Sequence, residues 1–182
     1  NAGVIAGSVT VSNSAGTVIL GGGTITATNF VVNNAGSLVV SNAVSLGSGT
    51  LAVGGLGAVT LAGNYAKGSL LMGGSGVLSL AASNGYAGGT VITNGTVDAT
   101  ASSYALGSGS VTLNGGQLLL GGRTNAVSWV TLGSGTISGS GSGLLRSAGG
   151  YSVTNGVIGA NLGGGVLTKG GSGTVTLSGS NS

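Results

Sequence analysis

The stretch that decides the fold of this chain is residues 70–122, which read LLMGGSGVLSLAASNGYAGGTVITNGTVDATASSYALGSGSVTLNGGQLLLGG. Short runs in it, such as VLSL from Val77 and SVTL from Ser110, alternate apolar and polar residues. Such alternation predicts a β-strand with one buried face. Glycine and asparagine separate the runs, and both tolerate the positive φ angles that sharp turns require. The stretch therefore predicts short strands joined by tight turns.

The rest of the chain also consists of short alternating runs separated by glycine, asparagine and serine. The apolar residues keep the 3.6-residue spacing of a helix over no window of it. Collagen needs a Gly-X-Y period with proline, and the sequence contains no proline. Disordered chains are highly charged and poorly hydrophobic, whereas this one is 41% hydrophobic and 3% charged. With collagen and disorder excluded, the composition favours a β-repeat that is rich in turns. The alternation directs these residues inward, into the core: Val9, Val11, Val18, Leu20, Leu38, Val40, Leu51, Val53, Leu78, Leu80, Val111, Leu113, Val175 and Leu177.

Two turn motifs recur and set the architecture. Gly-Ser-Gly precedes a strand at Gly47, Gly74, Gly107, Gly133, Gly141 and Gly171. An asparagine with a glycine close behind it precedes a strand at Asn13, Asn33, Asn94, Asn114 and Asn155. The asparagine motif recurs after about 20 residues, from Asn13 to Asn33 and from Asn94 to Asn114, which is a common length for a solenoid repeat. The Gly-Ser-Gly motif recurs after about 27 residues, from Gly47 to Gly74 and from Gly107 to Gly133, which is also within the solenoid range.

Recurrence at intervals of these lengths, with three strands per period, is typical of a β-solenoid. We predict a right-handed parallel β-helix of about seven to nine coils, formed by residues 1–182 as a single domain. Asn13 should lie above Asn33, and Asn94 above Asn114. A β-sandwich is the alternative architecture.

The composition excludes most catalytic chemistry. Asp98 is the one carboxylate side chain, so paired acid–base catalysis within one chain is excluded. The chain has no His and no Cys, which removes the usual zinc ligands and nucleophile–base pairs. We therefore expect no enzyme activity, no metal and no cofactor. The four cations are scattered, which argues against nucleic-acid binding, and no apolar run approaches the roughly 20 residues of a membrane-spanning helix.

The few charged and aromatic residues leave alternatives open. Lys67 and Lys169 lie near glycine-rich turns, where they are either solvated or guard an edge against strand pairing. Asp98 either accepts hydrogen bonds at a turn or pairs with a neighbouring subunit, and Arg123 and Arg146 are solvated, paired or bound to a sugar or phosphate. Tyr65 and Tyr86 either form a sugar-binding platform or pack over the turns, and Trp129 lies in the core or an interface. Ice binding would need a regular Thr-x-Thr array; residues 24–26 and 174–176 qualify, but the motif does not recur once per coil.

Residues 70–122 and the final stretch LTKGGSGTVTLSGSNS, residues 167–182, resemble the autotransporter-associated β-strand repeat, also called the passenger-associated transport repeat. The first stretch carries most of that pattern, including Tyr86, Gly88, Gly89 and Thr90, and the second stops before the Tyr-x-Gly-Gly-Thr segment. A degenerate copy, LAGNYAKGS, occupies residues 61–69. The resemblance covers about a third of the chain. It implies a β-helix on a large exported bacterial protein, without catalytic residues.

An almost uncharged surface is poorly suited to a free monomer, and solenoids normally cap their ends. No helical or charged cap is recognisable in the sequence, so we expect the end coils to be covered. The expected partners are copies of the chain, joined end to end through Val9, Val11, Val175 and Leu177, or neighbouring coils of a longer chain. The predicted role is structural and extracellular, in a fibre or surface layer. The alternatives are a segment of an autotransporter-type adhesin passenger and an ice- or glycan-binding solenoid, the latter with surface polysaccharide as its partner.

Overall fold

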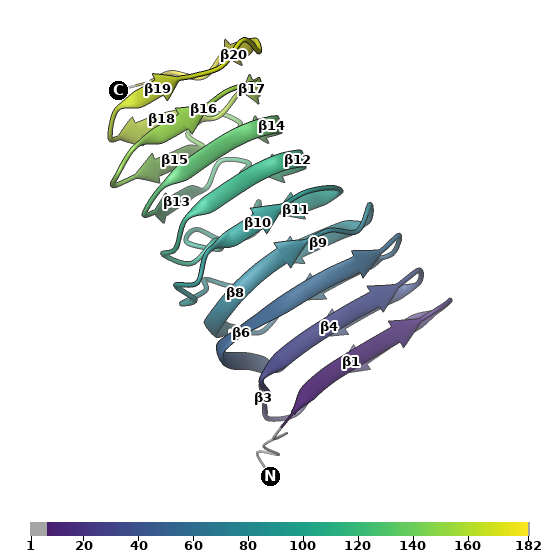
Figure 1. Cartoon of the computed structure of the whole chain (residues 1–182). Helices are drawn as coiled ribbons and strands as arrows, with labels where there is room; N and C mark the ends of the chain where they lie inside the picture. Colours follow the sequence, from purple (N-terminus) through teal and green to yellow (C-terminus); the bar gives the residue numbers. More distant parts are fainter. Residues whose placement is uncertain (1–6, 182) are drawn as a thin grey trace.

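The computed structural model describes residues 7–181, so the first six residues and Ser182 of the predicted single domain lie outside the described part. The described chain is all-β and winds through about eight turns of a parallel β-solenoid (Figure 1). Every strand pairing in it is parallel, for example β1 with β4 and β5 with β7. These pairings confirm the predicted β-helix and exclude an antiparallel sandwich. Within residues 7–181 we find no helix that could span a membrane.

Each turn contributes up to three strand segments, and like segments stack into three faces. Face 1 contains β1 (Ser8–Asn13), β4 (Asn29–Asn34), residues 50–55 of β6 (Ala43–Gly55), residues 69–72 of β8 (Tyr65–Met72), β10 (Thr90–Ile92), residues 111–114 of β12 (Val111–Leu119), residues 130–134 of β14 (Val130–Ser138), β16 (Tyr151–Val153) and β19 (Leu167–Lys169).

The other two faces follow in chain order within each turn. Face 2 contains β2 (Thr17–Leu20), β5 (Ser37–Val40), β7 (Ala58–Leu61), β9 (Val77–Leu80), β11 (Thr96–Asp98), the remainders of β12 and β14, β17 (Gly156–Ile158) and β20 (Val175–Leu177). Face 3 contains β3 (Thr24–Thr26), residues 43–45 of β6, residues 65–67 of β8, β13 (Thr124–Val127), β15 (Leu144–Ser147) and β18 (Asn161–Gly164).

The strand register gives the length of a turn. Phe30 pairs with Leu51 and Leu51 with Leu70, so one turn takes about 20 residues, a length that solenoid repeats commonly have. The last step on face 1, from Tyr151 to Leu167, is shorter than the others. The period predicted from the asparagine motif is therefore confirmed for most turns. The longer period, predicted from the Gly-Ser-Gly motif, is wrong.

The longer period fails because Gly-Ser-Gly occurs at more than one corner of the solenoid. Gly47 and Gly107 lie between face 3 and face 1, whereas Gly74, Gly133 and Gly171 lie between face 1 and face 2. The interval from Gly47 to Gly74 therefore spans one full turn and one further strand. The motif marks a tight corner, but it does not identify which corner.

The asparagine motif, in contrast, is specific for one corner, because all five copies lie between face 1 and face 2. The predicted vertical pairs are wrong by one residue. Asn13 pairs with Asn34, while Asn33 pairs with Ser12. Ile92 pairs with Leu113, which places Asn114 beside Thr93 rather than Asn94.

Asn34, which is stacked on Asn13, repeats the two hydrogen bonds that the Asn13 side-chain amide donates. The Asn13 side-chain amide donates to the carbonyl oxygens of Gly16 and Ser37, both at 3.2 Å. The Asn34 amide donates to those of Gly36 and Ala58, at 2.8 and 3.2 Å. Each amide thus ties its own corner to the next turn, which explains why the second member of the Asn33–Asn34 pair is the one in register.

The core prediction is confirmed in the middle of the solenoid and incomplete at its ends. Fully buried are Leu38, Val40, Leu51, Val53, Leu78, Leu80, Val111 and Leu113. Val9, Val11, Val18, Leu20 and Val175 are half-buried and pack against this core, whereas Leu177 is 43% exposed. These six residues belong to the first and last turns, where only one neighbouring turn covers them. Position in the stack, rather than strand sequence, sets their burial.

Where face 3 lacks strands, side-chain amides form the hydrogen bonds between neighbouring turns. Residues 84–86 and 103–106 lie on this face but form no ladder. The Asn84 Oδ1 atom accepts the Tyr65 N–H at 2.7 Å, and the Asn84 amide donates to the Ala105 carbonyl at 2.7 Å. The Asn125 Oδ1 atom accepts the Leu106 N–H at 3.1 Å. The turns therefore remain linked on this face without regular β-structure.

Candidate assembly surfaces at the ends of the solenoid

The N-terminal surface consists of β1, β2 and β3. Within residues 7–181, β1 pairs with β4 alone, and Val9 and Val11 stack on Phe30 and Val32. Both valines stay half-buried because no described segment covers their other side. A hollow of about 320 Å³ opens beside Val9, with Leu20 also among its lining residues. The two predicted assembly residues of this end therefore lie on an incompletely covered core.

The backbone of β1 also has a free edge. The carbonyl oxygens of Gly7 and Asn13 accept hydrogen bonds from the β4 side. Successive residues of a parallel strand direct their N–H and C=O groups to opposite neighbours. Ser8, Thr10 and Ser12 therefore direct theirs away from β4. These groups are the hydrogen-bonding template of the N-terminal surface.

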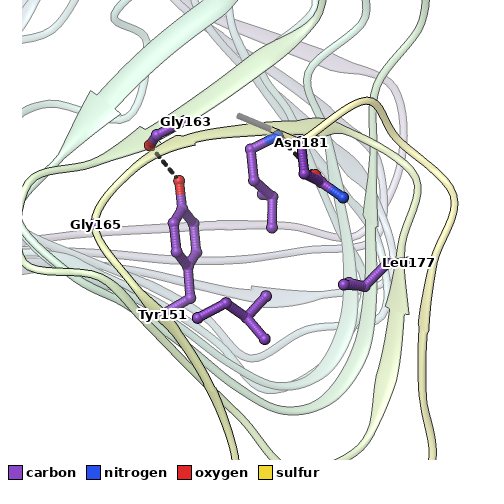
Figure 2. A pocket seen from close by; sticks show the side chains of 7 residues that line it. Tyr151, Gly163, Gly165, Leu177 and Asn181 are labelled. Carbon is purple, nitrogen blue, oxygen red and sulfur yellow. Dashed lines mark hydrogen bonds between the residues drawn. The ribbon is translucent and has the colours of Figure 1, made fainter.

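The C-terminal surface contains a cavity of about 270 Å³ in the last turn (Figure 2). Tyr151, Leu162, Leu167 and Leu177 supply its side-chain wall, together with Asn181 and two glycines. Figure 2 shows the Leu177 side chain directed into the cavity although its position is 43% exposed. An inward direction combined with high exposure shows that the last turn is open at the end of the core.

Tyr151 forms the floor of this cavity and is fixed by three backbone groups. Its hydroxyl lies 2.7 Å from the carbonyl oxygens of both Leu145 and Gly163 and accepts the Ser147 N–H at 3.1 Å. Burial raises the pKa of the Tyr151 phenol. The ring is thus held as a neutral, rigid part of the C-terminal surface.

Asn181 links the last turn to the preceding one through its side chain, as Asn84 does in an inner turn. Its Oδ1 atom accepts the Leu162 N–H at 3.1 Å, and the two residues form a parallel bridge. Asn84 makes the equivalent contact to Tyr65. The final stretch that resembles the repeat therefore folds as the inner copy does at this position.

Lys169 occupies an unexpected place in the C-terminal surface. It pairs with Val153, a fully buried residue of face 1, so it stands in an inward column of the last turn. Its ammonium group turns back and donates to the carbonyl oxygens of Gly170 and Gly171, at 2.7 and 3.0 Å. The sequence places Lys169 where the inner copy has Met72, which is the signal that reveals its column. The open end of the core thus carries one cation.

The two predicted assembly pairs are far apart in one chain. Val9 and Val11 lie in the first turn, and Val175 and Leu177 in the last (Figure 1). Leu177 stacks on Ile158, and Val175 on Gly156. Contact between the two pairs therefore requires two copies of the chain.

Of the two alternatives for Tyr65 and Tyr86, the sugar-binding platform is wrong. Tyr65 and Tyr86 are fully buried, and their rings stack at a centroid distance of 4.7 Å. The Tyr65 hydroxyl donates to the Ser69 carbonyl at 2.6 Å, and the Tyr86 hydroxyl lies 2.7 Å from Thr90 Oγ1. Burial raises the pKa of Tyr65 to about 12 and raises that of Tyr86 as well. Both rings are core residues with satisfied hydroxyls.

The remaining candidates are dispersed over the surface. The Asp98 carboxylate accepts the Thr100 N–H at 2.9 Å, as expected for a turn, and the Arg123 Nε–H donates to the Thr100 carbonyl at 3.1 Å. The Thr-x-Thr segments at residues 24–26 and 174–176 lie on different faces, in β3 on face 3 and at β20 on face 2, so they form no common array. In the part of the chain that the structure describes, no three His, Cys, Asp or Glu residues come together.

The chain matches no protein-family model, and it has no significant match among the curated proteins or the solved structures that were compared with it.

Proposed function

We propose that this chain is a non-catalytic, extracellular structural protein whose copies stack end to end into a fibre. The observation that carries the proposal is the pair of open surfaces described above. Within residues 7–181, each end presents an incompletely covered apolar core together with a free strand edge. Buried backbone groups without partners cost about 1–3 kcal/mol each, so covering one end with another satisfies both together.

The C-terminal edge complements the N-terminal one. The Val166 carbonyl accepts the Tyr151 N–H, and the Gly170 N–H donates to Val153, so β19 directs the groups of Leu167 and Lys169 outward. On face 2, the Thr174 carbonyl and the Ser178 N–H bond to β17, so Val175 and Leu177 direct theirs outward. A β1–β3 turn of a second copy added here would continue the parallel ladders. Such a head-to-tail contact propagates instead of closing.

The low charge of the chain also supports self-association. The whole sequence has four cationic side chains and one anionic one. Charged residues are a common device against edge-to-edge pairing, and they are scarce here. Because the contact would consist of backbone hydrogen bonds and apolar packing, its strength should change little with ionic strength.

A segment of an autotransporter-type passenger is the second candidate. The resemblance of residues 70–122 to the passenger-associated repeat favours it, as does the repeat-like position of Asn181. In that case neighbouring coils of a longer chain cover the same two surfaces. The two candidates differ in what the isolated chain does in solution.

Electron microscopy and sedimentation of the purified chain test the proposal. We expect filaments, or a mass that grows without limit as the concentration rises. Val175→Pro removes an N–H from the free edge, where proline is tolerated because no internal ladder uses that group. Leu177→Lys places a charge in the open cavity. Each variant should shorten or abolish the filaments while circular dichroism stays unchanged.

The matched control is Leu56→Lys, which adds the same charge at a 75%-exposed turn position in the middle of the solenoid. This variant should form filaments as the parent does. A parent chain that is a compact monomer at every concentration would contradict the fibre and favour the passenger segment.

A further inference from the structure

The outward central column of face 1 is continuous over the whole solenoid. Successive register pairs connect one outward residue of each turn to the next along nine strand segments. In order these residues are Thr10, Val31, Ala52, Leu71, Val91, Thr112, Thr131, Ser152 and Thr168. Side chains on neighbouring strands are spaced about 4.8 Å apart, so the column is a regular row along the axis.

The outer side of face 1 carries no charged residue within the described chain. Lys67 and Arg146 belong to face 3, and Asp98 to face 2. Arg123 lies at the corner between faces 2 and 3, and Lys169 stands in an inward column. Burying this surface therefore requires no ion to leave water, a step that carries a large desolvation cost for each ion.

The N-terminal half of the row is mostly apolar. Val31, Leu71 and Val91 are each 37% exposed, and Ala52 completes a run of four consecutive turns. Trp129, 40% exposed, lies at the edge of the same face, with its ring packed over Gly149 of the next turn. Clusters of exposed apolar and aromatic side chains of this kind are typical of interaction surfaces.

A second copy of the chain is the partner that fits this surface best. Two packed sheets interdigitate their side chains at a separation of about 10 Å. A partner with a different repeat would fall out of step within a few turns. Another copy has the same repeat, the same row of outward side chains and the same absence of charge on this face.

The available area is sufficient for a specific contact. Nine strand segments at a rise of about 4.8 Å give a length of about 38 Å, and segments of about four to five residues on average, at about 3.3 Å per residue, give a width of about 15 Å. Apposing two such faces buries more than about 1,000 Å² in total, which is the lower limit for a specific interface.

We propose that two copies pair laterally through the outer side of face 1, related by a two-fold axis. This contact is distinct from the end-to-end contact, because it uses outward side chains instead of strand edges. An isologous interface closes at two copies, whereas the end-to-end contact propagates. The two kinds of association therefore give different mass distributions.

Sedimentation velocity of the Val175→Pro variant distinguishes lateral pairing from end-to-end stacking. With end-to-end stacking suppressed, we expect a monomer–dimer equilibrium and no larger species. Adding Leu71→Lys or Val91→Lys places two like charges in the buried row of the dimer, so the dissociation constant should rise at least tenfold. The control Thr60→Lys adds the same charge on the outer side of face 2 and should leave the constant unchanged.

A Val175→Pro chain that is monomeric at every concentration would overturn the lateral pairing. So would a dissociation constant that Leu71→Lys and Thr60→Lys change equally, or that neither substitution changes. A monomer that sediments with insoluble cellulose in a Leu71-dependent manner would also overturn it and would assign the face to polysaccharide. Loss of filaments in Val175→Pro with a retained dimer supports both contacts independently.

Discussion

Leu78 and Leu177 belong to the same inward column of face 2, yet one is fully buried and the other is 43% exposed. Leu78 lies between Val59 and Val97 of the neighbouring turns, whereas Leu177 has only Ile158 beneath it. The difference arises from the number of covering turns. In a solenoid each turn contacts only its neighbours, so stability is a sum of turn-to-turn interfaces. The inner turns have two such interfaces and the end turns one.

The largest expected effect is the loss of an inner core side chain. Leu78→Ala should destabilise the chain by about 3–5 kcal/mol, because it leaves a cavity between two turns that cannot collapse. Leu177→Ala should cost about 1 kcal/mol or less, since its site is already open. Guanidinium denaturation followed by circular dichroism measures both. Equal losses would show that the last turn is covered in solution.

The next largest effect concerns the close approach of turns at glycine. A Cβ on Gly49 would lie 1.5 Å from the Thr28 carbonyl oxygen, so Gly49→Ala must push two turns apart. We expect a loss of about 3 kcal/mol. Gly21→Ala in the first turn meets nothing within 4 Å and should change stability by less than about 0.5 kcal/mol. Thermal unfolding of the two variants checks this contrast, which disappears if the turns are loosely stacked.

A smaller effect concerns pH and the buried tyrosines of the inner turns. Folding raises the pKa of Tyr65 from 10 to about 12, so the folded chain keeps a proton that the unfolded chain releases. The resulting stability is present below pH 10 and is lost as the pH rises towards 12. Tyr65→Phe should flatten this alkaline decline, at a cost of about 1 kcal/mol at pH 7 for the hydrogen bond to Ser69. Denaturation midpoints between pH 8 and pH 12 give the test, and a parent profile without decline would contradict it.

The smallest effect on the chain itself, but the sharpest test of its ends, comes from Lys169. Its cation stands above the buried Val153, where the inner repeat copy has Met72, and covering it requires the ammonium to leave water. Lys169→Met should leave folding nearly unchanged and strengthen end-to-end association severalfold in sedimentation experiments. Lys67→Met removes an equal charge from face 3 and serves as the control. Weaker association of Lys169→Met would mean that the lysine helps to make the contact.

The sequence predicted what depends on local pattern. Alternation directed Leu51, Leu78 and Leu113 inward, since neighbouring side chains of a strand point to opposite faces whatever lies above them. The asparagine motif marked one corner for a similar reason, because its turn is formed by consecutive residues. The parallel stacking followed from the regular recurrence of that motif.

The sequence alone could not predict the features that depend on the register between turns. Asn33 and Asn34 are adjacent and chemically identical, and only the pairing of β1 with β4 decides which one lies over Asn13. The column of Lys169 was missed in the same way, although the aligned Met72 was visible. The last turn departs further. Lys169 precedes Leu177 by eight residues, whereas Met72 precedes Leu78, which stands in the same face 2 column as Leu177, by six. Matching the motifs alone would therefore have put Val175 in that column.

The stacking of turns also determines how the chain responds to tension along its axis. The hydrogen bonds of the ladders run parallel to that axis, so each gap between turns bears the whole load, and the gaps are arranged in series. The weakest gap opens first, and an end turn has the fewest contacts to resist. Each opened gap releases about 20 residues, or about 65 Å of extended chain. A pulled solenoid of this kind would lengthen in nearly equal steps, and each step would lower the force between the two structures that its ends connect.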